Sequence, residues 1–210
     1  MRVLTSVECY ADYDGSSLGS LRLVDADGDG MVTMDEVKSV RLLTNRRDKN
    51  GSIFINNTQI RCFREFAYFT QLNEYNSTFS GCTNLKYVEL PPVKEFYGAT
   101  FKGTAIEEIT VPEGVEFIDQ GFGWDCHYLR YLSLPSTIKT LTRTSSLLSG
   151  TAAMTVVCKA ITPPDFPGGW GYLTDIRAIY VPDESVEMYQ SAATWSTKSS
   201  VIHPMSEYAG

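Results

Sequence analysis

The chain has 210 residues, 43% hydrophobic and 20% charged, which is the composition of a folded protein rather than a disordered or fibrous one. Its 25 acidic and 18 basic residues give a net charge of −7, and without a dense Lys/Arg run this argues against nucleic acid as a partner. No apolar stretch approaches the ~20 residues of a membrane helix, and residues 1–10 lack the apolar core of a signal peptide. We therefore expect a soluble chain without direct membrane insertion, whose leader, if it is exported, is not present in this sequence.

The N-terminal segment contains the most specific motif of the chain, DADGDGMVTMDE at residues 25–36. Its spacing is that of a complete EF-hand loop, which surrounds one calcium ion with oxygen ligands. Gly30 allows the sharp turn at the sixth position, and Glu36 closes the loop with both carboxylate oxygens. The alternative interpretation is an acidic turn that binds no metal. The predicted calcium ligands are Asp25, Asp27, Asp29, Met31 through its backbone carbonyl, Thr33 and Glu36.

A helix is expected to leave this loop. Thr33 stands three residues before Glu36, which is the spacing of a capping box, and Val37 and Val40 follow. A second EF-hand is not expected, because residues 48–57 have no glycine at the sixth place and no closing glutamate. The unpaired loop indicates a structural calcium ion rather than a sensor, with the weak affinity of extracellular modules, about 10⁻⁴ to 10⁻³ M.

An internal repeat follows. Its pattern is an apolar residue, two of any kind, an apolar residue, one of any kind, an apolar residue and a proline. Leucine-rich repeats start roughly every 20 to 29 residues, and the starts of this pattern are spaced within that range. Each unit offers a short strand whose alternate residues face inward, and one unit cannot bury that face alone, so the units must stack. The pattern starts at Leu85, Ile106, Leu129 and Ile176, and in a degraded form at Ala153.

The repeat predicts a mostly β solenoid of short parallel strands. We expect residues 1–59 to form a small, partly helical cap with the calcium loop, residues 60–182 the solenoid, and residues 183–210 a helical C-terminal cap. Within the solenoid, a second inward ridge is expected from Phe79, Phe101 and Phe122.

The five cysteines form a scattered set without a CxxC pair, which argues against a disulfide scaffold and a zinc site. We expect them to be small core residues. Cys82 and Cys126 lie two repeats apart, and strands spaced ~4.8 Å apart place their Cα atoms ~9 to 10 Å apart. This separation exceeds the ~7 Å limit for a disulfide.

The C-terminal segment is predicted to cap the solenoid, because an exposed end would aggregate. A helix is expected to begin near Asp183 and Glu184, with Val186, Tyr189 and Ala193 on one face, and Trp195 is expected to seal the last repeat. Before it, Trp170 and Tyr172 lie in the loop PGGWGY. They could stack on a sugar, but packing against the last repeat is the favoured interpretation.

Several segments resemble the BspA-like leucine-rich-repeat surface proteins of gut and oral bacteria. TFSGCTNLKYVELP (78–91) and EEITVPEGVEFI (107–118) carry the likeness. NNTQIRCFREFAYFTQL (56–72) is similar to the family's first repeat, where Ile60, Phe63, Phe66 and Phe69 would cap the solenoid, and CKAITPPDF (158–166) and IYVPDESVEMYQSAATW (179–195) are similar to its closing segments. The resemblance implies surface exposure and protein recognition, including adhesion to host matrix or to other bacteria. The chain departs from the family's pattern at Gly123, Trp124 and Asp125, and residues 145–150 lack the aromatic of the ridge.

These features predict a non-enzymatic binding module of the cell surface or the extracellular space. Only two histidines, His127 and His203, could serve as a base, and neither stands in a catalytic motif. Solenoids expose their outward strand residues as one sheet on which a protein can lie; carbohydrate is the lesser alternative ligand. The predicted partner-binding residues are Tyr87, Glu89, Glu108, Thr110, Tyr131, Ser133, Thr155, Val157, Ala178 and Tyr180.

The alternative function is a structural spacer or capping unit of a larger surface protein. A contiguous aromatic patch on the outward strand residues would favour recognition, whereas a uniformly hydrated face would favour the spacer. The sequence leaves this choice open.

Overall fold

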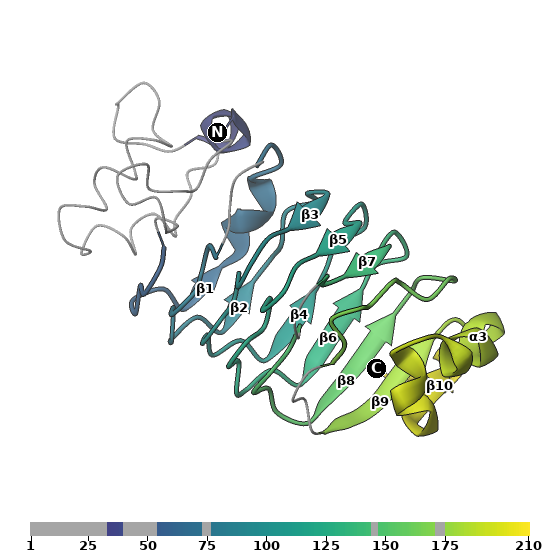
Figure 1. Cartoon of the computed structure of the whole chain (residues 1–210). Helices are drawn as coiled ribbons and strands as arrows, with labels where there is room; N and C mark the ends of the chain where they lie inside the picture. Colours follow the sequence, from purple (N-terminus) through teal and green to yellow (C-terminus); the bar gives the residue numbers. More distant parts are fainter. Residues whose placement is uncertain (1–32, 40–53, 73–76, 144–146, 171–174) are drawn as a thin grey trace.

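The computed structural model describes residues 33–39, 54–72, 77–143, 147–170 and 175–210, which form an elongated stack of short strands (Figure 1). Five strands pair in the order β10-β9-β8-β6-β4, and β1 pairs with β2. Each of these pairings is parallel, so the predicted solenoid of short parallel strands is confirmed in the described residues. The strands are β1 (Cys62–Phe63), β2 (Tyr87–Val88), β4 (Glu108–Thr110), β6 (Tyr131–Leu134), β8 (Met154–Cys158), β9 (Ile176–Val181) and β10 (Ile202–Pro204).

The apolar positions of the repeat explain this ladder. The strand register aligns one inward residue from each strand of the five-stranded sheet, and all of these side chains are buried. Because successive strand residues point to opposite faces, their neighbours must face outward. The aligned inward residues are Ile109, Leu132, Val156, Ile179 and Ile202.

The expectation of one continuous sheet is wrong. In the described residues the outward strands form two sheets, because β1 and β2 pair only with each other and no ladder joins β2 to β4. β2 spans two residues, and Pro91 and Pro92, which follow soon after, have no N–H to donate to a neighbouring strand. The strand face, defined here as the outward side of both sheets, is therefore divided after β2.

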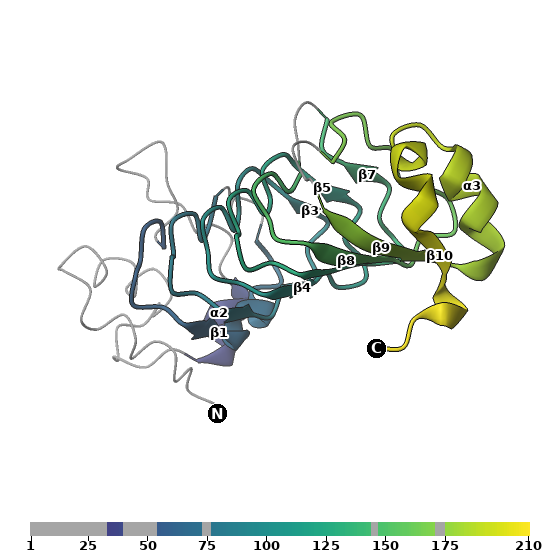
Figure 2. The same cartoon turned by 90° about the horizontal axis from the view of Figure 1, so that it is seen from below.

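A second parallel sheet lies on the opposite side of the solenoid (Figure 2). It has three strands in the order β3-β5-β7: β3 (Glu95–Phe96), β5 (Phe117–Ile118) and β7 (Thr140–Leu141). Phe96, Ile118 and Leu141 are in register and buried. The repeats that start at Leu85, Ile106 and Leu129 therefore contribute one strand to each side, and the sequence-based prediction included only the first of the two strands.

The phenylalanine ridge forms between the sheets as predicted. Phe79, Phe101 and Phe122 are fully buried, with ring centroids 5.6 Å apart for the first pair and 5.1 Å for the second. Backbone hydrogen bonds show that the third ring is displaced by one residue, because Gly123 accepts from Cys126 as Phe101 accepts from Thr104.

The missing ring at Gly123 is replaced from the next repeat. A Cβ atom on Gly123 would lie 2.8 Å from the side chain of Leu148, which is fully buried. Leu147 is also fully buried and accepts a hydrogen bond from the Gly123 amide at 3.2 Å. The repeat without an aromatic therefore fills its core with two leucines.

The C-terminal segment closes one end of the stack with short helices (Figure 1). Tyr189 and Trp195 are fully buried, and the Trp195 indole donates to the Pro164 carbonyl at 3.0 Å, so the predicted seal is confirmed. The prediction for Ala193 is wrong, because α3 ends at Ser191 and Ala193 is exposed. The helices are η3 (Asp183–Ser185), α3 (Val186–Ser191), η4 (Trp195–Val201) and η5 (Met205–Glu207).

The strand ladder continues beyond residue 182, the predicted end of the solenoid. β10 lies between η4 and η5 and pairs with β9, with Ile202 opposite Ile179. The C-terminal cap therefore adds an edge strand to the five-stranded sheet as well as helices.

The other end of the described stack is capped by aromatic residues. η2 (Arg64–Tyr68) follows β1, and the four predicted cap residues, Ile60, Phe63, Phe66 and Phe69, are all buried. The Phe63 ring lies 6.0 Å from the rings of both Phe66 and Phe69 and 5.8 Å from Phe79. This cluster joins the first repeat to the ridge.

Candidate binding surface

The strand register arranges eight of the ten predicted partner-binding residues in two rows across the strand face. One row contains Glu108, Tyr131, Thr155 and Ala178. The other contains Thr110, Ser133, Val157 and Tyr180, and it ends at His203 of β10. Tyr87 and Glu89 lie at β2, beyond the division of the face. The prediction that these residues form columns is therefore confirmed for the five-stranded sheet.

Exposure varies strongly along this surface. Tyr87 is 42% exposed, and Glu89, Glu108 and Thr110 are also exposed. Tyr131, Thr155, Ala178 and Tyr180 are half-buried. The expectation of exposed side chains is wrong for Ser133 and Val157, which are only 2% and 3% exposed.

A residue outside the repeats packs on the strand face. The Tyr208 ring lies 6.3 Å from Tyr131, nearly parallel to it at 18°, and 4.9 Å from Tyr180. Tyr131 and Tyr180 belong to β6 and β9, which flank β8. Tyr208 therefore lies over β8, whose outward residues are Thr155 and Val157. Sequence reasoning missed Tyr208, because it follows the last repeat and belongs to no motif.

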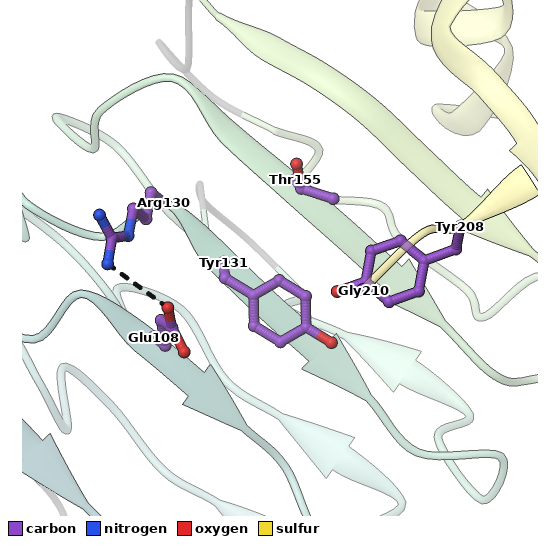
Figure 3. Close-up of a pocket in the computed structure, with 6 residues that line it drawn as sticks. All are labelled: Glu108, Arg130, Tyr131, Thr155, Tyr208 and Gly210. Atoms are coloured by element: carbon purple, nitrogen blue, oxygen red, sulfur yellow. Dashed lines mark ion pairs between the residues drawn. The ribbon is translucent and has the colours of Figure 1, made fainter.

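A hollow of about 480 Å³ opens beside Tyr208 (Figure 3), lined by Glu108, Arg130, Tyr131, Thr155, Tyr208 and Gly210. The Arg130 guanidinium lies 2.9 Å from Glu107 and 3.5 Å from Glu108, so one cation faces two carboxylates. A hydrogen bond with Tyr131 is the main cause that raises the pKa of Tyr208 to about 12, and the Glu108 charge contributes in the same direction. The hollow thus combines aromatic faces with groups that donate and accept hydrogen bonds.

A smaller aromatic and charged cluster lies at β2. The Arg64 guanidinium lies 5.0 Å from the centre of the Tyr87 ring and 3.9 Å from the Glu89 carboxylate. The Tyr87 hydroxyl donates to Glu89 at 3.0 Å, and this hydrogen bond is the main cause that raises the pKa of Tyr87. Tyr87 is therefore oriented by polar contacts and leaves much of its ring in solvent.

Four of the six predicted calcium ligands, Asp25, Asp27, Asp29 and Met31, lie outside the described residues. Thr33 and Glu36 are described, and they form the predicted capping box at the start of α2 (Met34–Ser39). The Glu36 carboxylate accepts from the Thr33 amide at 2.7 Å and from its hydroxyl at 2.8 Å, while the Glu36 amide donates to that hydroxyl at 3.3 Å. The capping box is therefore confirmed, whereas the calcium site stays a prediction. Val37 is fully buried.

The cysteine prediction is confirmed for the three buried cysteines. The Cys82 thiol donates to the Phe54 carbonyl at 2.9 Å, and the Cys126 thiol donates to the Phe101 carbonyl at 2.8 Å. Burial raises the pKa of Cys82 to about 12 and that of Cys158 to about 11. The prediction is wrong for Cys62, which is exposed on β1, the outermost described strand. Cys9 lies outside the described residues.

The histidines contact groups that provide no nucleophile. The His127 Nδ1 atom lies 2.8 Å from the Gly150 carbonyl, whereas the thiol of the adjacent Cys126 is buried and burial raises its pKa. His203 lies 3.5 Å from Glu207, four residues further along the chain. Across the described ranges, no group of three or more His, Cys, Asp or Glu side chains could hold a metal ion.

Trp170 is buried, as the favoured interpretation of its loop predicted. Its ring packs edge-on against Phe166 and Trp195, with centroid distances of 4.9 and 5.1 Å. This packing leaves no open face on which a sugar could stack. Tyr172 lies outside the described residues.

Comparison with known proteins identifies the repeats. The family description "BspA type Leucine rich repeat region" matches residues 69–155, in six copies. A search of curated proteins found no match to the chain. No helix in the described part of the chain is both long and apolar enough to cross a membrane. Leucine-rich-repeat regions are typically non-catalytic and generally mediate protein binding, and the BspA type suggests a bacterial surface protein. Residues 69–155 are therefore a BspA-type leucine-rich-repeat region.

Proposed function

We propose that the chain is a module of the bacterial cell surface or the extracellular space that binds a protein through its strand face. The observation that carries this proposal is the contiguous aromatic surface made by Tyr131, Tyr180 and Tyr208. Aromatic residues are enriched in the few positions that supply most of the free energy of a protein interface. Host matrix proteins and surface proteins of other bacteria are the partner classes that the family resemblance favours.

The exposed tyrosine at β2 extends this surface toward the first repeat. Arg64 lies over the Tyr87 ring, and Glu89 accepts a hydrogen bond from the Tyr87 hydroxyl. These two contacts restrict the orientation of the ring. Such restriction lowers the entropy that a side chain loses when a partner binds. Tyr87 is therefore a candidate anchor that is not covered by the C-terminal segment.

A matched pair of tyrosines tests this proposal. Tyr87 and Tyr97 are 42% and 38% exposed, and each hydroxyl donates to a glutamate two residues earlier or later in the chain. Tyr97 follows β3, however, and so belongs to the opposite sheet. For immobilised extracellular-matrix proteins, the dissociation constant of Tyr87→Ala should be at least tenfold that of the native chain, a loss of ~1.4 kcal/mol. The dissociation constant of Tyr97→Ala should rise less than about twofold.

The competing function, a structural spacer, predicts a different result. If neither Tyr87→Ala nor Tyr131→Ala changes binding to any protein of the panel, the strand face is not a recognition surface. That outcome would favour the spacer.

We further propose that the segment 25–36 binds one structural calcium ion. The proposal is supported by the spacing of the loop and by the adjacent Thr33 and Glu36 oxygens, 2.8 Å apart. When bound, the ion would neutralise the clustered carboxylates and hold the loop against α2. Calcium-dependent thermal unfolding tests this proposal independently of partner binding.

A further inference from the structure

Residues 205–210 lie against part of the surface proposed for partner binding. After β10, η5 leads into Tyr208, and the C-terminal segment lies on the strand-face side of the solenoid (Figure 2). The segment is anchored at Ser206, whose amide donates a hydrogen bond to the Asp183 carboxylate at 2.9 Å. The Tyr208 amide donates to the Met205 carbonyl at 3.0 Å, which closes a single turn. Beyond this turn, Tyr208 provides the ring contacts with the strands.

The contact of Tyr208 differs from those of the structural aromatic residues. Tyr189 and Trp195 are fully buried in the core, whereas Tyr208 is half-buried and rests on the outside of the sheet. Its ring sits between Tyr131 and Tyr180, and beside it lies the open hollow of about 480 Å³ (Figure 3). Because Tyr208 rests on the outer side of the sheet, its displacement would leave the buried core closed.

We propose that the position between Tyr131 and Tyr180 accepts a tyrosine side chain from a protein partner. Tyr208 fills this position in the free chain, and the partner's tyrosine displaces it. This inference rests on the proposed function and names the chemistry of the partner. The contacts already in the structure support this choice of side chain, because the Tyr208 ring lies nearly parallel to that of Tyr131 and 4.9 Å from that of Tyr180. Arg130, Glu108 and Thr155 line the adjacent hollow, where they can contact polar groups that flank the partner's tyrosine.

The displacement of Tyr208 is local, because the segment stays anchored at Ser206. Asp183 and Ser206 remain paired while residues 208–210 swing away, so β10 keeps its pairing with β9. A partner must compete with the tethered ring, whose effective concentration on a short flexible linker is on the order of millimolar. The apparent dissociation constant of the native chain is therefore the intrinsic one divided by the fraction of chains in which the position is open.

A peptide with the sequence of residues 204–210, PMSEYAG, serves as the probe. We expect it to bind the full chain carrying Tyr208→Ala with a dissociation constant of about 0.1 mM, one tenth of the effective concentration of the tethered ring, measured from backbone amide NMR shifts of β6, β8 and β9. The native chain should bind it at least tenfold more weakly, because its own ring competes. The same peptide with alanine in place of its tyrosine should not bind.

Two further variants control this experiment. Tyr208→Phe keeps the ring and should exclude the peptide nearly as well as the native chain does. Adding Tyr180→Ala to Tyr208→Ala should abolish peptide binding, and the amide spectrum of each variant reports whether it is folded. The inference is overturned if the peptide does not bind folded Tyr208→Ala, or if it binds the native chain equally well.

The matrix-protein assay separates this inference from the proposed function. If Tyr87→Ala weakens protein binding but the peptide fails to bind Tyr208→Ala, only the displaceable tyrosine is refuted. If the peptide binds Tyr208→Ala but Tyr87→Ala and Tyr131→Ala leave protein binding unchanged, the tyrosine position is supported and the proposed function fails.

Discussion

Phe101→Ala should destabilise the solenoid more than any change to an exposed aromatic residue. Phe101 has no solvent-exposed area and stands in the middle of the ridge, 5.6 Å from Phe79 and 5.1 Å from Phe122 by ring centroid. Truncating a buried phenylalanine typically costs about 3 to 5 kcal/mol, and each lost ring pair accounts for about 0.5 to 1.5 kcal/mol beyond burial. Because two pairs are lost, we expect a decrease of about 4 to 5 kcal/mol in the free energy of unfolding, in the upper part of that range.

Urea denaturation followed by circular dichroism measures this loss. In a solenoid each repeat is stabilised by its neighbours, so a cavity in a central repeat weakens the contacts on both sides. Tyr128→Ala is the matched control, because Tyr128 is 65% exposed in the turn of a neighbouring repeat and its removal should change stability by less than about 0.5 kcal/mol. A loss below about 1 kcal/mol for Phe101→Ala, with an unchanged denaturant slope, would refute the ridge as a source of stability.

Three other predictions follow from described residues. With a dissociation constant of about 10⁻⁴ to 10⁻³ M, 10 mM calcium should stabilise the chelator-treated chain by about 1.4 to 2.7 kcal/mol, and Glu36→Gln should remove this gain while keeping the helix cap. Cys62 should react with a thiol reagent in the folded protein, whereas Cys82 should react only after unfolding, because burial raises its pKa to about 12. The Tyr208 contact should be fully present below pH 10, the ordinary pKa, and lost as pH rises through about 12, because its pKa is raised in the docked state. Tyr131→Phe should move that titration back toward 10, observed as phenolate absorbance relative to Tyr208→Phe.

Each of these predictions has a result that contradicts it. Calcium stabilisation that survives Glu36→Gln but disappears in Asp35→Asn would place the ion elsewhere. Unchanged labelling of the folded protein in Cys62→Ser would contradict the exposure of that thiol. A Tyr208 titration that is unaffected by Tyr131→Phe would show that the two phenols do not interact.

The sequence predicted the strand face well because the inward positions repeat with a short period. Ile109, Leu132, Val156 and Ile179 come into register as the repeat starts required. The buried cap was expected from the resemblance to the family's first repeat, in which Ile60, Phe63, Phe66 and Phe69 recur at every third residue. Where one physical rule, burial of alternate residues in stacked strands, determines the structure, the pattern of the sequence was sufficient.

The second sheet could have been predicted from a signal that is present in the sequence. Phe96, Ile118 and Leu141 recur with the period of the first ladder, and Val93, Val115 and Ile138 precede each of them by three residues. These strands span two residues each, so they show no alternation of their own. Only alignment of the repeats against one another would have revealed them.

The coverage of the strand face by Tyr208 had no such signal. The position of Tyr208 depends on the path of the chain after β10, and that path is held by tertiary contacts such as the Asp183–Ser206 hydrogen bond. The exposure of Cys62, in contrast, follows from its place in the repeat, because it pairs with the outward Tyr87 and precedes the inward Phe63. Repeat patterns predict which residues face inward, but not what covers the residues that face outward.

Hydrogen–deuterium exchange of the chain with a bound matrix protein tests the central claim most directly. The account predicts that the partner slows exchange at the amides of β2, β4 and β6, on the strand face, and leaves β3, β5 and β7 unchanged. Slower exchange confined to β3, β5 and β7 would contradict the account and assign recognition to the opposite sheet.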